Sequence, residues 1–353
     1  MKARVYLDHA ATTPLLPAAR GAMEQGFAAW ANPSSPHGEG RGAKALLEDA
    51  RARIGAALDW DGHVIFTSGA TEALTIALTR SKAAQALASA TEHDAVLRHV
   101  PPEHRLPVDT SGIAQLPEAI APGTLFAIQQ ANSETGVIQP LDALAARIHE
   151  AGGLLLADCS QSAGKIALPQ AADMIVISAH KLGGPIGVGA LLVRDLEMLN
   201  PGGGQEQGYR GGTEAMPLAL GFAAALEAPR DWLDDVARWR LDLDAAIRAA
   251  GGEVVAADQL RLPTIAGYRM PGVSAQAQLI RFDMAGFAVS AGSACSSGTL
   301  KPSGVLTAMG WQAEHAAQVI RVSLGHATQE TDIQAFLAQW QGLYSAHNSG
   351  QRP

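Results

Sequence analysis

The sequence predicts an α/β fold in which a large domain, built on a mainly parallel sheet flanked by helices, is joined to a smaller α+β domain. Short apolar runs that end in polar side chains alternate with segments of helical composition, which is the order of βαβ units. A chain of 353 residues is also too long for one simple core. The composition shifts at 228–230, so we expect a large domain at 15–230 and a small domain that combines 1–14 with 231–353.

The first elements are a short strand, a polar loop and a helix. Residues 4–8 form a strand pattern that runs into a turn, which Pro14 and Pro17 keep extended. The loop 32–38 is rich in turn residues, and its spacing alone leaves open whether it borders a site or is an ordinary connection. The Ala, Leu, Arg and Glu content then predicts a helix over 42–58.

A strand at 64–67 enters a glycine turn and a helix that runs to about Leu78. The first turn of such a helix exposes backbone N–H groups, so 68–71 is a candidate phosphate cradle. An ordinary helix cap is the alternative reading, because Ser and Thr commonly cap helices. His93 follows at a strand-to-helix junction, where a lone histidine is more often a structural hydrogen-bonding group than a catalyst.

The large domain continues with a strand that starts at 125 and runs into a polar turn, strand patterns at 153–158, 174–178 and 187–194, and an amphipathic helix at 141–151. This order predicts parallel strands joined by right-handed crossovers. The long loop 201–213 could be a linker or a phosphate loop, but it lacks the Gly-Lys-Ser/Thr ending of a nucleotide P-loop and the dinucleotide spacing. The small domain shows helices at 231–250 and about 331–345, and strands near 253–255, 264–266 and 320–324.

The stretch 173–185 carries the strongest chemical signal. Its apolar run leads to Ser178, His180 and Lys181, and the strand before it ends in Asp158, with Gln161 three residues later. Parallel strands bring such ends to one edge of the sheet, where open α/β sheets bind ligands. An amine, a carboxylate and nearby donors suit pyridoxal phosphate, which needs a Schiff-base partner, a partner for its ring nitrogen and phosphate donors. A lone lysine would by default be a surface charge.

Three further residues stand out against their surroundings. Cys159 lies in a buried-strand context and fits an inert, packed thiol. Cys295 lies among Ser and Gly, where a packing role is implausible, so we interpret it as an exposed, mobile nucleophile. Arg321 interrupts an Ile-Val-Leu strand, which favours a guanidinium that meets a carboxylate in fork geometry over a buried structural ion pair.

Composition narrows the class of protein. Hydrophobic residues make up 47% of the chain and charged residues 17%, and no apolar run approaches the roughly 18 residues of a membrane span. The start of the sequence has no apolar signal-peptide core, because the acid Asp8 comes almost immediately. We therefore expect a cytoplasmic protein. A formal charge of −8 argues against a nucleic-acid surface. Two cysteines give neither a disulfide framework nor a zinc spacing, so no metal site is expected.

The motifs together resemble the cysteine desulfurases of the NifS/IscS type, within the class V aminotransferases. The resemblance runs from about 5 to 325 and rests on the ordered motifs YLDHAATTPL, NPSSPHG, FTSGATEA, EHDAVL, NSETGVIQP, DCSQSAGK, SAHKLGGP, GGGQEQGYRGGT, GSACSSG and IRVSLG. It implies the fold-type I aminotransferase architecture of pyridoxal phosphate enzymes and a homodimer. It also implies conversion of L-cysteine to L-alanine with sulfur left on the protein as a persulfide. The length of 295–303 resembles the subgroup with a long, mobile cysteine loop.

The resemblance implies a role for each matching residue. Lys181 would bind the cofactor covalently and move protons, His93 would stack on the ring and assist, and Cys295 would attack the substrate sulfur. Asp158 would pair with the ring nitrogen and Gln161 would bond the ring oxygen. The phosphate would lie among Ala70, Thr71, Ser178 and His180, with Thr213 supplied by the second subunit. The substrate carboxylate would be held by Arg321 with help from Asn32.

Two positions depart from the family pattern. Ser133 replaces the second of two asparagines, the one that usually bonds the ring oxygen, so its hydroxyl, a water or Asn132 would have to substitute. Gly211 replaces a common serine. The sulfur acceptor is open between an iron–sulfur scaffold and another sulfur-transfer protein, for cluster assembly, tRNA thiolation or thio-cofactor synthesis. Competing interpretations are a selenocysteine lyase, another class V enzyme, and a non-catalytic scaffold. The retention of Lys181 and Cys295 argues against the non-catalytic scaffold.

Overall fold

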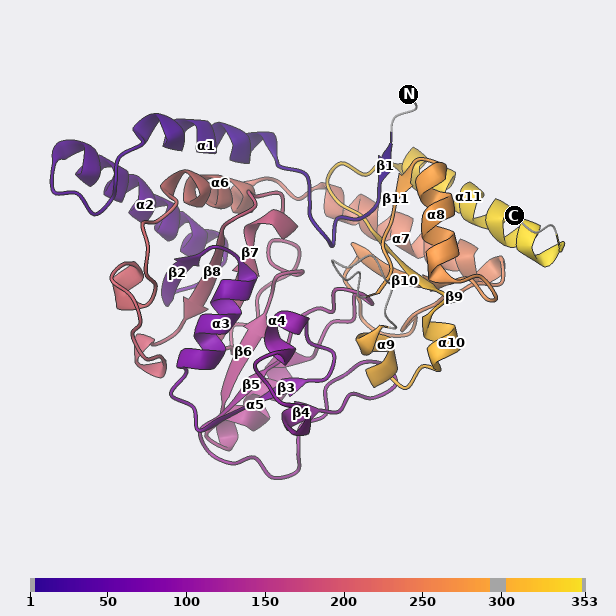
Figure 1. Ribbon diagram of the computed structural model, residues 1–353, viewed down its shortest axis with the longest axis horizontal. Coiled ribbons are helices and arrows are strands. Elements are labelled where there is room, and N and C mark those ends of the chain that lie inside the picture. Colours follow the sequence, from indigo (N-terminus) through magenta and orange to yellow (C-terminus); the bar gives the residue numbers. More distant parts are fainter. Residues whose placement is uncertain (1–3, 293–302, 351–353) are drawn as a thin grey trace.

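The computed structural model describes residues 4–292 and 303–350, and its larger half is built on one sheet (Figure 1). Seven strands lie in the order β2 (His63–Thr67), β8 (Gly189–Val193), β7 (Met174–Ser178), β6 (Leu154–Asp158), β5 (Thr124–Ala127), β3 (Gln85–Ser89) and β4 (Arg105–Leu106). The strands from β7 to β4 are parallel, whereas β8 is antiparallel to both of its neighbours. The sheet is therefore mainly parallel, with one reversed strand.

Helices cover both faces of this sheet, which explains why its strands read as unbroken apolar runs. The helices of this half are α1 (Pro17–Ala29), α2 (Gly38–Ala57), α3 (Ala70–Arg80), α4 (Asp94–Leu97), α5 (Leu141–Glu150) and α6 (Met216–Glu227). Alternate residues of a strand point to opposite faces. Ile175 and Ile177 accordingly pack in one core with α2, α5 and α6, while Met174 and Val176 pack in another with α3 and α4.

Helices α1 and α6 have no counterpart in the sequence predictions. Nearly every residue of α6 from Ala219 onward is buried, so the helix has no polar face and no amphipathic period to detect. Glycines allow α1 and α6 to pack closely: a Cβ on Gly26 would lie 2.6 Å from Pro217 Cα, and one on Gly221 would lie 2.6 Å from Met23 Cγ. Helix α2 begins at Gly38 rather than at 42, because the His37 ring accepts a hydrogen bond from the Gly40 N–H.

The smaller half combines the chain start with the C-terminal third (Figure 1). In an antiparallel sheet, β10 (Ile265–Arg269) lies between β12 (Val319–Ser323) and β9 (Glu253–Val254), while β1 (Val5–Tyr6) pairs in parallel with β11 (Phe287–Ala288). The helices of this half are α7 (Trp232–Ala249), α8 (Ala275–Met284), α9 (Gly304–Ala308), α10 (Ala313–Ala316) and α11 (Glu330–Asn348).

The core of the smaller half supports the expected division of the chain. Phe282 stacks on Phe336 with ring centroids 4.9 Å apart, and Leu7, which is fully buried, joins the same cluster. Because Val5 and Leu7 pack in this core, we propose the domain limits expected from the sequence, 15–230 for the large domain and 1–14 with 231–353 for the small one. Within the described residues, no helix combines the length and the apolar character needed to cross a bilayer.

Candidate active site

The carboxyl ends of two adjacent parallel strands carry the acid and the amine singled out in the sequence. Asp158 is the last residue of β6 and is paired with Val176 of β7, and Lys181 follows the end of β7 by three residues, in a short 3-10 turn. Asp158 Oδ1 accepts hydrogen bonds from the backbone N–H of Ser160 at 2.9 Å and from its hydroxyl at 2.6 Å. These bonds fix the carboxylate and leave Oδ2 without a hydrogen-bond donor among the described residues.

The backbone carbonyl of Ala10 joins three parts of the chain at this edge. It accepts a hydrogen bond from Lys181 Nζ and one from Gln161 Nε2, the latter at 2.9 Å. Gln161 Oε1 is buried and has no partner among the described residues. An orphaned amide oxygen is costly inside a protein unless a ligand or water satisfies it, so Gln161 indicates a polar occupant beside Lys181.

The surroundings of Lys181 favour its neutral form. Burial, and then the positive charge of Arg321, lower the pKa of Lys181 to about 8, while Asp158 and Asp8 act in the opposite direction. A neutral amine is the nucleophilic and basic form, and burial is the usual way in which proteins prepare a lysine for Schiff-base chemistry.

We expect this lowered pKa to be measurable in the cofactor-free protein. Only the neutral amine reacts with acetic anhydride, so labelling of Lys181 should rise with pH through a midpoint near 8, well below the ordinary lysine value of 10.5. Arg321→Gln removes a charge that lowers the pKa and should raise the midpoint, whereas Asp158→Asn should lower it. Mass spectrometry of the labelled peptides provides the measurement, and a wild-type midpoint above 10 would contradict the assignment.

The N-terminus of α3 lies next to the end of β7. Gly69, the residue before the helix, has φ +148°, and a Cβ on Gly189 would lie 2.8 Å from its Cα, while Gly189 is the pairing partner of Ser178. The helix supplies no acceptors for the first-turn amides of Ala70 and Thr71, so these amides can bind an anion. The Glu72 carboxylate bonds the Ser68 N–H and an Arg210 guanidinium N–H at 3.2 Å, which fixes the turn.

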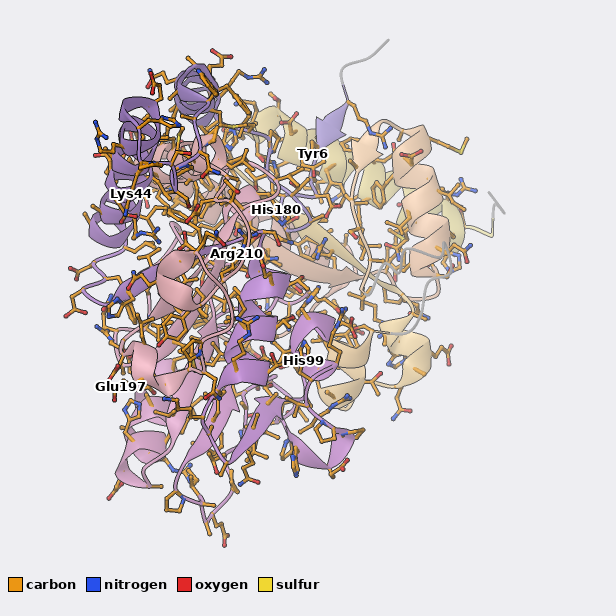
Figure 2. The ribbon with its side chains drawn as sticks, turned by 60° about the vertical axis from the view of Figure 1, so that its left-hand side comes forward. Tyr6, Lys44, His99, His180, Glu197 and Arg210 are labelled. Carbon is orange, nitrogen blue, oxygen red and sulfur yellow. The ribbon has the colours of Figure 1, made fainter. Side chains whose placement is uncertain are left out.

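His180 lies on the edge of the large sheet that faces Tyr6 and the smaller half (Figure 2). Its Nδ1 is 3.2 Å from the Thr12 hydroxyl. Burial, and then the charge of Lys181, lower the pKa of His180 to about 4, so its ring is neutral at pH 7. As a neutral ring it contributes one N–H donor to the site.

His93 caps the short helix α4. Its Nδ1 accepts a hydrogen bond from the Ala95 N–H at 3.1 Å, so the neutral ring carries its proton on Nε2. The same end of β3 is tied to the end of β5, because the Thr91 carbonyl accepts hydrogen bonds from Gln129 Nε2 at 2.6 Å and from Asn132 Nδ2 at 3.1 Å.

Asn132 shapes the turn after β5. Its Oδ1 accepts the N–H groups of Glu134 and Thr135, both at 2.9 Å, so the side-chain oxygen is committed to the backbone. One amide hydrogen remains after the bond to Thr91. Ser133 contributes its carbonyl, which accepts a hydrogen bond from Arg321 Nη1 at 3.0 Å.

Arg321 forms an ion pair within the chain, with Asp8, which is the structural ion pair that the sequence analysis gave as the alternative. Arg321 Nη2 lies 2.7 Å from Asp8 Oδ1 in a single contact rather than a two-pronged one, and Arg321 Nε is buried without a partner among the described residues. Only one nitrogen of the Arg321 guanidinium therefore contacts the Asp8 carboxylate. Sequence reasoning missed Asp8, although its place beside the turn-forming residues of the YLDHAATTPL motif was a signal that could have been followed.

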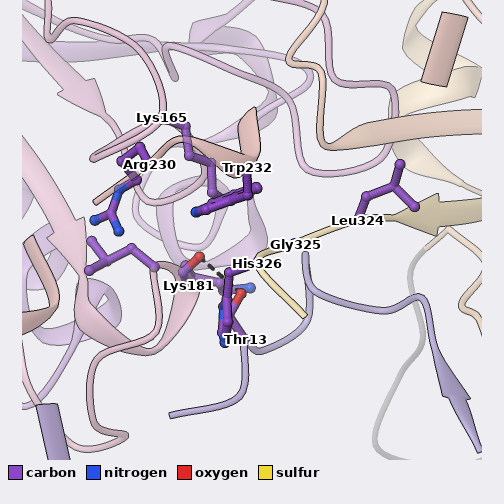
Figure 3. Close-up of a pocket in the computed structure, with 9 residues that line it drawn as sticks. Thr13, Lys165, Lys181, Arg230, Trp232, Leu324, Gly325 and His326 are labelled. Carbon is purple, nitrogen blue, oxygen red and sulfur yellow. Dashed lines mark hydrogen bonds between the residues drawn. The ribbon is translucent and has the colours of Figure 1, made fainter. Parts of the chain in front are cut away.

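A second lysine, which is partly buried, also escaped the sequence analysis. Lys165 lies with Lys181, Arg230 and His326 around a small cavity (Figure 3). Its Nζ donates to the Gln161 carbonyl at 2.8 Å, and burial followed by the charges of Lys181 and Arg230 lowers the pKa of Lys165 to about 7. Its position in the sequence could have indicated this, because Lys165 follows Gln161 by four residues, about one helical turn.

Three expected site residues are not joined to this cluster in the single chain. Asn32 is exposed and uses its Oδ1 to accept the Ser34 N–H at 2.9 Å. Thr213 is exposed at the end of the loop that the resemblance assigns to the second subunit. Cys295 lies outside the described residues. The roles expected for all three stay predictions.

The comparisons with known proteins agree with this geometry. The family model described as "Aminotransferase class-V" matches residues 5–336. This chain is a class V aminotransferase. The "Cysteine desulfurase" of Cereibacter sphaeroides is 38% identical and spans 95% of this chain and 94% of its own length. "Cysteine desulfurase IscS 1" of Archaeoglobus fulgidus is 33% identical and spans 96% of both chains.

Solved structures extend the likeness to three dimensions. A NifS-like protein from Rickettsia africae has a TM-score of 0.88 at 29% identity, covering 97% of this class V aminotransferase and 99% of that chain. A structure described as "SspA in complex with cysteine" has a TM-score of 0.77 at 29% identity, covering 91% and 98% respectively. The fold-type I architecture predicted from the sequence is therefore confirmed.

Class V aminotransferases use pyridoxal phosphate, and the residues at the sheet edge fit it. The fit rests on a partly buried lysine with a lowered pKa, the free oxygen of Asp158 and the second amide hydrogen of Gln161 Nε2, which the bond to the Ala10 carbonyl leaves available. The uncommitted amides at the start of α3 add a place for a phosphate. The cofactor prediction is confirmed at the level of the family.

Proposed function

We propose that this class V aminotransferase is a cysteine desulfurase that converts L-cysteine to L-alanine and leaves the sulfur on Cys295 as a persulfide. The observation that carries the proposal is the near full-length similarity to curated cysteine desulfurases, including one that is 38% identical over 95% of this chain. The cluster of Lys181, Asp158 and Gln161 supports it, because a fold retained only for binding would have no use for a buried lysine with a lowered pKa.

The cofactor would be held by groups from four elements of the large domain. Lys181 would bind it covalently, Asp158 Oδ2 would hold the proton of its ring nitrogen, and Gln161 would donate from Nε2 to its ring oxygen. Its phosphate would accept hydrogen bonds from Ala70, Thr71, Ser178 and His180. Since Asn132 Oδ1 is committed to the turn, its remaining amide hydrogen or the Ser133 hydroxyl would supply any further donor.

Bound pyridoxal phosphate supplies an electron sink for the bonds of the substrate Cα. Lys181 is the base that takes the proton from Cα and returns it, since a pKa of about 8 makes both directions accessible near neutral pH. His93, with its proton on Nε2, would support the ring and assist this transfer. Arg321 would hold the substrate carboxylate through the donors that Asp8 leaves free, which orients the Cα–H bond toward Lys181.

The sulfur transfer balances without an outside oxidant. The Cys295 thiolate attacks the substrate sulfur, a sulfur–sulfur bond forms, and the carbon–sulfur bond breaks with its electron pair left on carbon. Protonation of that carbon yields alanine. In total, one protein thiol and one cysteine are consumed, and one protein persulfide and one alanine are formed.

We further propose that the working unit is a homodimer, in which Thr213 and the loop 201–213 complete the phosphate site of the partner subunit. The loop is built for a defined shape: Glu206 and Gln207 have positive φ values of 48° and 56°, and the buried Glu206 carboxylate is held by Arg51 at 2.7 Å. Left-handed backbone at two consecutive non-glycine residues persists only where surrounding contacts hold it. The sulfur acceptor would be an iron–sulfur scaffold or another sulfur-transfer protein.

The direct test is product formation by the purified holoenzyme. With L-cysteine and a reductant, we expect alanine and sulfide in equal amounts, and without the reductant we expect a persulfide on Cys295 by mass spectrometry. D-Cysteine is the matched control and should give neither product, because Arg321 and Lys181 fix the handedness of the substrate Cα. Holoenzyme that forms no alanine from L-cysteine would contradict the proposal, and turnover of selenocysteine alone would favour a selenocysteine lyase.

A further inference from the structure

The two ends of the segment that carries Cys295 meet at one carboxyl group. Gly292 precedes the segment 293–302 and Ser303 follows it. A Cβ built on Gly292 would lie 3.0 Å from Ser303 Cβ and 3.2 Å from Glu134 Oε2. Both flanks therefore pack against each other and against Glu134, which belongs to the large domain.

The contact with Ser303 is a specific hydrogen bond. Ser303 is only 4% exposed, and its hydroxyl donates to Glu134 Oε2 at 2.5 Å while it accepts the Leu306 N–H at 3.0 Å as the N-cap of α9. A serine hydroxyl has one proton to donate, so Glu134 receives all of its donor capacity. The start of α9 is thereby tied to the turn after β5.

The same turn also holds the residue expected to bind the substrate. The carbonyl of Ser133 accepts from Arg321 Nη1 at 3.0 Å, and the backbone of Arg321 exchanges hydrogen bonds with Ser290, two residues before Gly292. Asn132 Oδ1 holds the Glu134 N–H at 2.9 Å and so keeps the turn in shape. One turn thus contacts Arg321 on one side and both flanks of the cysteine segment on the other.

Glu134 does this from a position that is costly for a carboxyl group. Burial raises its pKa, and only the Ser303 hydroxyl and the charge of Arg321 act in the opposite direction. It borders a cavity of about 180 Å³ together with Gly292, Ser303 and Arg321. A partly buried carboxyl is retained at a loss in stability, and its hydrogen bond with Ser303 shows where it acts.

We propose that Glu134 is a positioning residue that fixes the base of the cysteine segment relative to Arg321, through the hydrogen bond that it accepts from Ser303. This inference rests on the proposed function, in which Arg321 holds the substrate carboxylate and Cys295 attacks its sulfur. Glu134 holds the two flanks of the segment, Gly292 and Ser303, in place relative to Arg321 and does not touch the reacting atoms.

The test compares Glu134→Ala, Ser303→Ala, the double variant and Glu134→Gln as holoenzymes. Loss of the bond should lower the rate of alanine formation at saturating L-cysteine by about 10- to 100-fold, with KM changed by less than about threefold, because small displacements of a reacting group cost that much. The double variant should form alanine at a rate within about threefold of that of Glu134→Ala, since both changes remove the same interaction. Glu134→Gln retains an acceptor oxygen and should stay within about threefold of the wild type.

A second readout does not depend on catalysis. Limited digestion with proteinase K, followed by mass spectrometry, reports cleavage within 293–302, and we expect Glu134→Ala and Ser303→Ala to be cut about tenfold faster than the wild type or Glu134→Gln. Asp195→Ala is the control, because the exposed Asp195 caps a short helical turn after β8 by accepting the Glu197 N–H at 2.8 Å. It should leave both readouts unchanged.

Three results would overturn the inference: wild-type cleavage in Glu134→Ala, a Glu134→Gln variant as slow as Glu134→Ala, or an increase in KM with an unchanged maximal rate. Failure of the proposed function looks different. In that case the wild type itself forms no alanine from L-cysteine, while the digestion pattern still decides whether Glu134 anchors the segment.

Discussion

Replacement of Lys181 by alanine is expected to abolish covalent attachment of pyridoxal phosphate and to reduce alanine formation by about 10⁴-fold or more. The amine is partly buried beside Asp158 and Gln161, and of these three groups it is the one that can both bind the cofactor covalently and return a proton to Cα. The groups around ring and phosphate remain in the variant, so it should still bind the cofactor, but reversibly. Reduction with borohydride followed by intact-mass measurement distinguishes the two modes of binding.

Lys165→Ala is the matched control for this prediction. Lys165 is a second, partly buried lysine with a lowered pKa, it borders the same cavity as Lys181, and it could in principle react with an aldehyde. Its Nζ is committed to the Gln161 carbonyl at 2.8 Å. We expect Lys165→Ala to retain the covalent cofactor after reduction. A cofactor that stays covalently bound in Lys181→Ala and is lost in Lys165→Ala would reverse the assignment.

Replacement of Cys295 by alanine is expected to preserve the bound cofactor and to lower alanine formation by about 10³-fold or more, because the other cysteine, Cys159, is buried and cannot accept the sulfur. The absorbance of the bound cofactor should remain that of the wild type, and the persulfide should disappear from the mass spectrum. Continued alanine and sulfide formation by the variant at the wild-type rate would show that the nucleophile had been assigned wrongly.

The second cysteine provides the control. Cys159 is fully buried, its thiol is close to Ser162, and burial followed by the charge of Asp158 raises its pKa well above the ordinary value. Such a thiol is protonated and inaccessible at neutral pH. Cys159→Ala should retain sulfur transfer within about threefold, and should lose roughly 1–2 kcal/mol of stability through the small cavity it leaves. Thermal unfolding measures the second effect.

The sequence determined the placement of the acid and the amine. The buried residues Leu155–Ala157 lead directly to Asp158, and five consecutive buried residues end in Ser178; such runs form adjacent parallel strands whose carboxyl ends share one edge. Local chemistry was enough for this prediction because the side chains follow directly from the strand ends. The same reasoning correctly placed His93 at the start of a helix and the glycine turn at Gly69 before α3.

Only the tertiary structure decided which distant groups share the site. Asp8 lies beside Arg321 although 313 positions separate them, and the Ala10 carbonyl joins Gln161 and Lys181 across more than 150 positions. Glu134 likewise meets Ser303 across 169 positions. Apart from Arg321, which lies in β12, these partners lie in turns or at helix ends without a hydrophobic period, so no local pattern specifies their contacts. Their positions follow from the packing of the N-terminal segment onto the small domain and of that domain against the edge of the large sheet, which fixes the loops in space.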